Sequence, residues 1–310
     1  MEPLLTALRA AGETTRLRII ALLSKGELTV GELVQILDQS QPRVSRHLKL
    51  MCDSGLLDRF QEGTQVFYRL ASYGVGGALN AAVVPLIDTT TGELPDDLSA
   101  LDAIRVERSD RAQAYFRANA ADWDKIRSLY IAEEQVETAL LGLLEHDRIS
   151  AMIDVGTGTG RMLELFAPRS DQALGIDVSR DMLAIARSQL AAQNLSHCQV
   201  RLGDMYDMGV PTGSQDLVVF HQVLHFADKP AEAITEAANA LAYNGILLVA
   251  DFAPHTQEFL RDEHAHRRLG FAEDEVNAWG LAAGLQATSA THLDDGDLRV
   301  TIWKFVKSKV

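Results

Sequence analysis

Apolar positions in the first forty residues recur at the spacing of short amphipathic helices. Thr14 or Thr15 is expected to be the N-cap of the first of these helices. The pair Thr29 and Glu32 has the three-residue spacing of a capping box and predicts the start of the next helix. Its apolar positions follow at i, i+3, i+4 and i+7, namely Val30, Leu33, Val34 and Leu37.

A further helix is predicted after Ser40, with Pro42 in its first turn, where no intrahelical N–H bond is lost. Its buried stripe consists of Val44, Leu48 and Met51. Apolar and polar residues then alternate on either side of a turn at Glu62-Gly63, which predicts a β-hairpin. Two short helices followed by a hairpin predict a winged helix-turn-helix.

The polar residues off the apolar stripe of the second helix are the types that read DNA. Arginine and glutamine make bidentate contacts to base edges, whereas serine and lysine contact phosphates. In a winged helix-turn-helix the second helix enters the major groove. The expected DNA-binding residues are Gln41, Arg43, Ser45, Arg46, His47, Lys49, Arg59 and Arg69. The alternative is a small helical domain whose basic residues form a solvated face.

From Ala151 onward, short apolar runs alternate with helical segments. The runs predicted as strands are Ala151–Val155, Gln172–Ile176, Cys198–Leu202, Asp216–Phe220 and Ile246–Phe252. The helices predicted between them are Arg161–Phe166, Ser179–Gln193 and Pro230–Leu241. This alternation predicts an α/β, Rossmann-like domain with a parallel sheet, whose ligand lies beyond the carboxyl ends of the strands.

The first of these strands ends in a glycine-rich turn, Gly156-Thr-Gly-Thr-Gly160, which lets the backbone approach a ligand closely. Asp177 ends the second strand, where a carboxylate accepts hydrogen bonds from ribose hydroxyls. A nicotinamide dinucleotide site would carry Gly-x-Gly-x-x-Gly, but the third glycine here comes one residue early. Asp154 precedes the first glycine by two residues and is placed to meet an amino group, which that dinucleotide lacks there.

The motifs Asp154–Gly160, Gly175–Asp177 and Gly203–Met205 resemble those of class I S-adenosylmethionine-dependent methyltransferases. The resemblance covers about residues 115–255 and implies that the chain binds S-adenosylmethionine or S-adenosylhomocysteine. The residues that it implies for this site are Asp154, Gly156, Gly158, Gly160, Asp177, Asp204, Met205 and His221.

Aromatic and histidine residues around this site have alternative interpretations. Tyr115 and Trp123 are expected to contact the ligand as a lid, with core packing as the alternative. His221 and His225 are the candidate general bases, and packing within the pocket is the competing interpretation.

The N-terminal part of the chain resembles the ArsR-type winged-helix repressors. The segments that carry this resemblance are Thr14–Leu23, Leu28–Leu33, Gln41–Lys49 and Gly55–Leu57. It covers about residues 1–85 and implies a homodimer, paired through helices near 3–11 and 75–87, that binds a two-fold operator in double-stranded DNA. Metal-sensing members carry two cysteines in the helix that here spans Thr29–Ile36, which has none. Because thiolates select soft metals, no metal site is expected there.

Charge is divided unevenly along the chain. Residues 1–90 carry nine Lys/Arg and nine Asp/Glu, so the whole net charge of −14 lies in residues 91–310. An anionic partner such as DNA is therefore expected to meet the first ninety residues.

Length and composition favour two globular domains, because 310 residues exceed what one core usually holds. The polar stretch Thr89–Asp97 marks a boundary. We expect a DNA-binding and dimerisation domain at 1–90, a linker and helical lid at 91–149, and a methyltransferase-like domain at 150–310. With two cysteines, no secretory signal and no membrane span, we expect a cytoplasmic protein.

The complete layout resembles the S-adenosylhomocysteine-responsive ArsR regulators, which control genes of the methionine cycle. It implies a transcriptional regulator, expected to be a repressor, whose second domain binds S-adenosylhomocysteine or S-adenosylmethionine as effector. One alternative is an active small-molecule methyltransferase with an appended DNA-binding domain. Another is a DNA-binding scaffold that holds a permanently bound cofactor.

Overall fold

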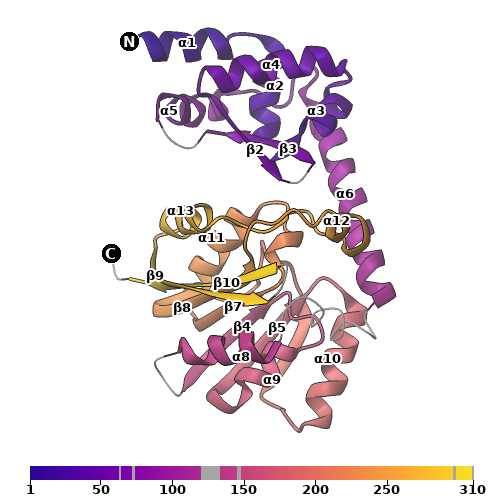
Figure 1. Cartoon of the computed structure of the whole chain (residues 1–310), viewed down its shortest axis with the longest axis vertical. Helices are drawn as coiled ribbons and strands as arrows, with labels where there is room; N and C mark the ends of the chain where they lie inside the picture. The colour runs from indigo at the N-terminus through magenta and orange to yellow at the C-terminus, as the bar shows by residue number, and fades with distance from the viewer. Residues whose placement is uncertain (63, 72–73, 120–132, 145–147, 296–297, 309–310) are drawn as a thin grey trace. The chain divides into compact units, whose positions relative to one another are not determined.

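The computed structural model describes residues 1–62, 64–71, 74–119, 133–144, 148–295 and 298–308. The chain divides into two compact units, Met1–Asp110 (unit 1) and Arg111–Val310 (unit 2), and each has its own apolar core. Figure 1 shows the elements of both units along the chain.

Unit 1 is a helical domain with a small antiparallel sheet. Its elements are α1 (Glu2–Ala11), α2 (Thr14–Leu23), β1 (Leu28–Thr29), α3 (Val30–Leu37), α4 (Gln41–Asp53), β2 (Leu57–Glu62), β3 (Gln65–Leu70), α5 (Gly74–Val83), the 3-10 turn η1 (Val84–Leu86) and the first part of α6 (Leu94–Asn119). The sheet has the order β1-β3-β2, and β2 and β3 form the hairpin. The predicted helix-turn-helix (α3 and α4) and its wing are confirmed.

Local signals explain most of the helix starts in unit 1. The capping box of α3 is present, with the Glu32 N–H donating to Thr29 Oγ1 (3.3 Å) and the Thr29 N–H donating to Glu32 Oε2 (2.8 Å). Helix α2 is present, but its predicted N-cap at Thr14 or Thr15 was wrong, because Glu13 is the N-cap and accepts the Arg16 N–H at 3.0 Å. Ser40 is the N-cap residue of α4 as expected, although its side chain makes no capping hydrogen bond.

A buried ion pair fastens α6 to α2. Both guanidinium nitrogens Nε and Nη2 of Arg18 donate to the Asp97 carboxylate at 2.6 Å, and the two side chains are 8% and 3% exposed. Leu101 and Ile104 of α6 complete the core of unit 1. Residues 94–104, which the sequence pattern places in a linker, therefore pack as part of the first unit.

Unit 2 is a seven-stranded sheet covered by helices. Its strands are β4 (Ile149–Val155), β5 (Ser170–Asp177), β6 (Cys198–Leu202), β7 (Gln215–His221), β8 (Leu241–Phe252), β9 (Leu285–Asp295) and β10 (Leu298–Lys307). The order is β6-β5-β4-β7-β8-β10-β9, parallel through β8 and antiparallel at β10 and β9. The predicted Rossmann-like fold is confirmed, and β8 begins at Leu241 rather than at Ile246 because Leu241 already pairs with Gln215.

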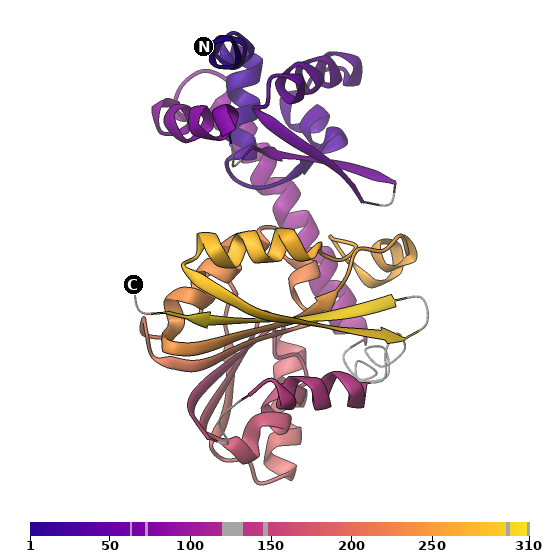
Figure 2. The same ribbon diagram turned by 60° about the vertical axis from the view of Figure 1, so that its left-hand side comes forward.

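The helices of unit 2 lie on both faces of the sheet (Figure 2). They are α8 (Glu133–Gly142), α9 (Arg161–Phe166), α10 (Arg180–Ala192), α11 (Pro230–Ala240), α12 (Phe259–His264) and α13 (Glu273–Ala282), with 3-10 turns η3 (Ala167–Arg169) and η4 (Leu224–Phe226). Successive residues of β4 alternate between two cores, Met152 facing α8 and α9 and Ile153 facing α11 and α13. The glycine turn lies at the carboxyl ends of the parallel strands, which is where ligands bind in folds of this kind.

Arg18→Met is expected to destabilise unit 1 by about 3–5 kcal/mol, because it leaves the Asp97 carboxylate buried without its cation. Glu93→Gln should cost less than about 1 kcal/mol, because Glu93 is the exposed second partner of Arg18. Hydrogen exchange of α2 and the start of α6 in the full chain, measured against urea, reports both effects. Equal losses for the two variants would contradict this account.

Candidate functional site

Helix α4 presents most of the predicted DNA-binding side chains to solvent. Val44, Leu48 and Met51 are fully buried and fix which face of the helix points inward. The predicted residues that are exposed on this helix are Gln41, Arg43, Ser45, Arg46 and Lys49. The helix therefore offers hydrogen-bond donors and positive charge on its open face, as a major-groove reader requires.

Two of the predicted DNA contacts are engaged within the protein. His47 is half-buried, with Nδ1 at 3.7 Å from Glu13 Oε2, and burial lowers its pKa against the opposing effect of that carboxylate. Arg69 lies on β3, with Nη1 at 3.5 Å from Glu27 Oε1 and Nε at 3.9 Å from Asp58 Oδ2. These contacts position both side chains, so a contact with DNA would have to share or replace them.

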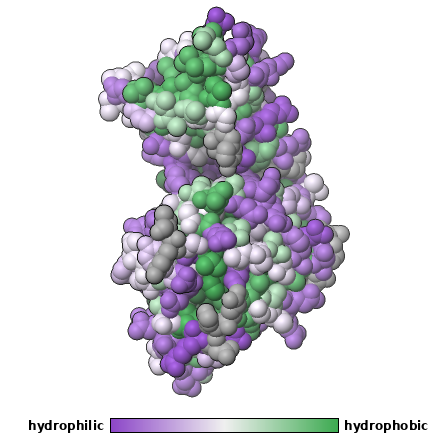
Figure 3. Space-filling view, turned by 90° about the vertical axis from the view of Figure 1, so that its left-hand side faces the viewer, coloured by the Kyte–Doolittle hydropathy of each residue, from purple (hydrophilic) through white to green (hydrophobic). Residues whose placement is uncertain are grey.

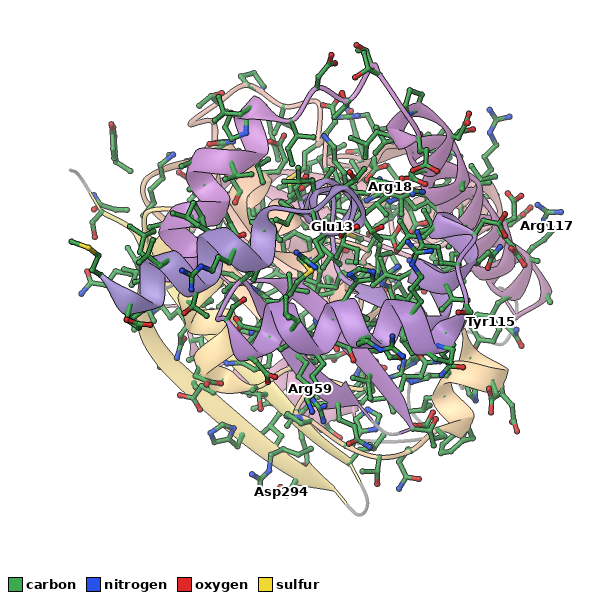
Figure 4. The ribbon with its side chains drawn as sticks, turned by 90° about the horizontal axis from the view of Figure 1, so that it is seen from above. Glu13, Arg18, Arg59, Tyr115, Arg117 and Asp294 are labelled. Carbon is green, nitrogen blue, oxygen red and sulfur yellow. The ribbon has the colours of Figure 1, made fainter. Side chains whose placement is uncertain are left out.

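The hairpin places Arg59 in the open. Arg59 is exposed on β2, beside α4 (Figure 4). Phe60 and Phe67 face each other across the hairpin with ring centroids 5.6 Å apart, which stiffens the wing that carries Arg59. Arg59 thus presents an exposed positive charge on the wing, as a contact with a phosphate would require.

The glycine turn after β4 has a backbone that other residues rarely adopt. The φ angles of Gly156, Gly158 and Gly160 are +71°, +53° and +91°. A Cβ on Gly156 would lie 2.2 Å from Val223 Cγ2, so the turn also packs against the segment that follows β7. The turn therefore needs glycine for its shape and for its close contact with the neighbouring loop.

Asp177 holds the glycine turn from the end of β5. Its Oδ2 accepts the Gly158 N–H at 2.9 Å, and its Oδ1 accepts the Ser179 N–H at 2.8 Å. Burial raises the pKa of Asp177, while these backbone N–H groups act in the opposite direction by stabilising the carboxylate. Because a carboxylate accepts about four hydrogen bonds and three backbone N–H groups act on this one, acceptor capacity remains for another donor, such as a ribose hydroxyl.

The remaining predicted ligand residues lie at the ends of neighbouring strands. Asp154 is 1% exposed near the end of β4, and His221 is 7% exposed at the end of β7. Asp204 is exposed after β6, where its carboxylate accepts the Tyr206 N–H at 3.0 Å, and Met205 is half-buried beside it. The parallel order β6-β5-β4-β7 gathers these strand ends at one edge of the sheet.

His225 has a buried partner that the sequence interpretation missed. His225 Nδ1 lies 2.8 Å from Asp251 Oδ1, and the two side chains are 3% and 0% exposed. The Asp251 carboxylate also accepts the backbone N–H of Phe252 at 2.8 Å. An acidic residue inside the otherwise apolar run Ile246–Phe252 was the available signal, because a buried carboxylate requires partners.

Histidine and aromatic rings surround this pair. The His266 ring stacks on the His225 ring with centroids 3.9 Å apart, and the centroid of the Phe226 ring lies 4.1 Å from that of His225. Burial lowers the pKa of His255 to about 4 and that of His266 well below its usual value, and the neighbouring histidines act in the same direction. Both rings are therefore neutral near pH 7.

Tyr115 lies against this histidine cluster. Its hydroxyl is 2.6 Å from His264 Nδ1. The adjacent Phe116 packs edge-to-face on Phe226, with ring centroids 4.9 Å apart. Trp123, the other predicted lid residue, lies outside the described residues.

Within the described part of the chain no group of three or more metal-binding side chains could hold an ion. None of the described helices has the length and apolar character needed to cross a membrane.

Comparison with known families finds a separate match in each of the two units. The family model for bacterial regulatory proteins of the ArsR family matches residues 13–59, and a methyltransferase-domain model matches residues 153–249.

Curated relatives match each half separately. The arsenical resistance operon repressor of Escherichia coli K12 is 52% identical over 62 residues, which cover 20% of this chain and 53% of the repressor. The malonyl-[acyl-carrier protein] O-methyltransferase of Halalkalibacterium halodurans is 28% identical over 133 residues, which cover 41% of this chain and 49% of that enzyme. The chain thus spans about half the length of each of these two relatives.

Solved structures resemble the second half. The [4+2]-cyclase SpnF superimposes with a TM-score of 0.52 at 18% identity, covering 58% of this chain and 82% of SpnF. YcgJ of Bacillus subtilis gives 0.50 at 15% identity, covering 57% of this chain and all of YcgJ. Geranyl diphosphate C-methyltransferase of Streptomyces coelicolor A3(2), solved with S-adenosyl-L-homocysteine, gives 0.50 at 11%, covering 57% and 78%. At these identities the likeness establishes the fold.

The fold defines a winged helix-turn-helix domain joined to a Rossmann-like α/β domain. More specifically, the chain carries an ArsR-family helix-turn-helix domain followed by a class I S-adenosylmethionine-dependent methyltransferase domain. The resemblance of each domain is confirmed, while the resemblance of the complete layout to S-adenosylhomocysteine-responsive regulators stays a prediction.

Arg46→Ala is expected to weaken binding to a DNA duplex selected by the wild-type protein from a random pool by about 5- to 150-fold, because an exposed arginine on α4 can contact a base edge. Arg187→Ala, which removes one exposed positive charge from α10, should leave the affinity unchanged. Fluorescence anisotropy at fixed salt measures both. An equal effect of the two substitutions would show that α4 is not the reading helix.

Proposed function

We propose that this protein is a transcriptional regulator, acting as a repressor, whose DNA affinity is set by S-adenosylhomocysteine or S-adenosylmethionine bound in the methyltransferase domain. The observation that carries the proposal is that one chain holds both an exposed basic recognition helix, α4, and a glycine turn braced by Asp177. A ligand that binds two conformations of the regulator unequally shifts the population between them. Genes of the methionine cycle are the proposed targets.

The glycine turn and the predicted ligand residues at the strand ends, together called the adenosyl crevice, fit an adenosyl ligand by their chemistry. Asp177 retains acceptor capacity for ribose hydroxyls, and the positive-φ glycines leave room for close approach. Asp204 and Met205 supply an exposed carboxylate and an apolar side chain for the adenine. Asp154 supplies negative charge near the first glycine, where the ammonium group of the ligand's methionine or homocysteine moiety would bind.

A homodimer paired through α1 and α5 belongs to this proposal. Figure 3 shows apolar surface gathered on one face of unit 1. The exposed apolar residues of these helices and of η1 are Leu4, Leu5, Leu8, Val75 and Leu86. A patch of this kind on a soluble domain typically marks an interface. A two-fold dimer would present two copies of α4 to the two halves of an operator.

The direct test is the affinity of the full chain for its selected duplex with either ligand added. One of the two ligands is expected to change the affinity by about 5- to 150-fold, the range of typical coupling between sites. Asp177→Ala should weaken binding of that ligand by about 10- to 100-fold, because hydrogen bonds to a charged group are lost. Calorimetry measures the ligand affinity, and anisotropy measures the DNA affinity.

Asp171→Asn is the matched control for Asp177→Ala. Asp171 is exposed at the other end of β5 and pairs with Arg148, so ligand affinity should be unchanged. If neither ligand changes the DNA affinity of the wild-type protein, the effector role is wrong. If neither ligand binds at all, the assignment of the crevice fails as well.

A second function, methyl transfer to a small molecule, is favoured by the pair His225–Asp251. When Nδ1–H of His225 donates to Asp251, Nε2 is the acceptor that could take a proton from a nucleophile. S-Adenosylmethionine would supply the methyl group. Such a reaction needs mainly positioning and the exclusion of water, so one base of this kind would suffice.

If the chain is an enzyme, His225→Gln should lower methyl transfer by about 10²- to 10⁴-fold, the usual contribution of a general base. The measurement is release of labelled methyl from S-adenosylmethionine across a panel of small nucleophiles. His197→Gln is the control, because His197 bonds to the Ala167 carbonyl away from these strand ends. Absence of turnover across the panel in the wild-type protein would count against this second function.

A further inference from the structure

Helix α6 belongs to both units of the chain. It runs from Leu94 to Asn119, and the division between the units falls after Asp110. Its first part therefore packs in the DNA-binding unit and its last turns pack in the methyltransferase unit. Each end makes specific side-chain contacts.

The first part of α6 contacts the helix-turn-helix itself. Asp97 is held by Arg18 of α2, and Leu101 is 1% exposed in the core. Arg108 forms an ion pair with Glu32, the residue whose other carboxylate oxygen completes the capping box of α3. Arg108 therefore links α6 to the first turn of α3.

The last turns of α6 contact three segments of unit 2. Phe116 packs edge-to-face on Phe226 of η4, with an interplanar angle of 74°. The hydroxyl of Tyr115, which Figure 4 labels, lies 2.6 Å from Nδ1 of His264 in α12. Arg117 Nε lies 3.6 Å from Asp181 Oδ2, in the first turn of α10.

Two of these segments continue directly from the predicted ligand residues. Phe226 follows His221 along the loop in which Val223 packs on Gly156. Asp181 follows Ser179, whose N–H donates to Asp177. A ligand that shifts either loop therefore alters the surface against which α6 ends.

We infer that α6 transmits the state of the adenosyl crevice to the helix-turn-helix, through Phe116 at one end and Arg108 at the other. The inference rests on the proposed effector role and specifies its route. Ligand binding changes the Phe226 and Asp181 contacts, and the Arg108–Glu32 pair carries the change to α3. Coupling between two sites is carried by an element that both of them bias, and α6 has side-chain contacts within each unit.

The test measures coupling separately from affinity. For the wild-type protein, Phe116→Ala, Arg108→Met and the double variant, DNA affinity is measured with and without saturating ligand, using whichever of S-adenosylhomocysteine or S-adenosylmethionine shifts the wild type. We expect each single variant to reduce the ligand effect to less than about 3-fold, from the wild-type range of about 5- to 150-fold. The affinities of ligand-free protein for DNA and of DNA-free protein for ligand should change less than about 3-fold.

The double variant and a surface control sharpen the result. If both residues lie on one route, the double variant should lose no more coupling than either single variant. Val106→Ala, at a position 59% exposed on the same helix, should keep the wild-type ligand effect. Alanine favours helix, so neither alanine substitution should weaken α6 itself.

Two outcomes overturn the inference and are distinguishable from each other. If the ligand shifts the wild-type DNA affinity and both single variants keep that shift, the route through α6 is wrong while the proposed function stands. If the ligand does not shift the wild-type affinity, the proposed function and the route fail together.

Discussion

The carboxylate of Asp177 joins two strand ends, and the candidate crevice depends on it. One oxygen holds the Gly158 N–H of the turn after β4, and the other holds the Ser179 N–H at the start of α10. The glycine turn, with positive φ angles at its three glycines, is therefore held in shape by hydrogen bonds within the protein. Such preorganisation lowers the entropy that binding must overcome. The same carboxylate thus holds the glycine turn and is the proposed acceptor for the ribose of the ligand.

The parts of this molecule that the sequence predicted are those with local signals. Buried strands read as uninterrupted apolar runs ending in Gly or Asp, and the parallel order gathers their ends at one edge, so Asp154, Asp177 and His221 were placed correctly at strand ends. The capping box at Thr29 depends on a three-residue spacing and was predicted for the same reason. Whether the strand-end residues bind a ligand stays a prediction.

Contacts between distant residues were beyond the sequence pattern. Asp97 looked like part of a polar linker, but Arg18, 79 residues earlier, draws it into the core and α6 begins at Leu94. Arg69 looked free for DNA until the structure placed Glu27 beside it. Asp251 and His225 are 26 residues apart and meet because β8 lies next to β7 in the sheet. In each case tertiary packing decides which charge is buried, and composition does not record it.

The fold leaves the chemistry open, since the [4+2]-cyclase SpnF shares it. Regulation and catalysis make opposite demands on η4. A catalytic base must be held within about 0.5 Å of its productive position, whereas a segment that reports occupancy must shift when the ligand binds. Asp251 fixes His225, and Phe226, the next residue, contacts α6. The chain can therefore serve both functions only if ligand binding moves Phe226 and leaves His225, the residue before it, in the position that Asp251 fixes.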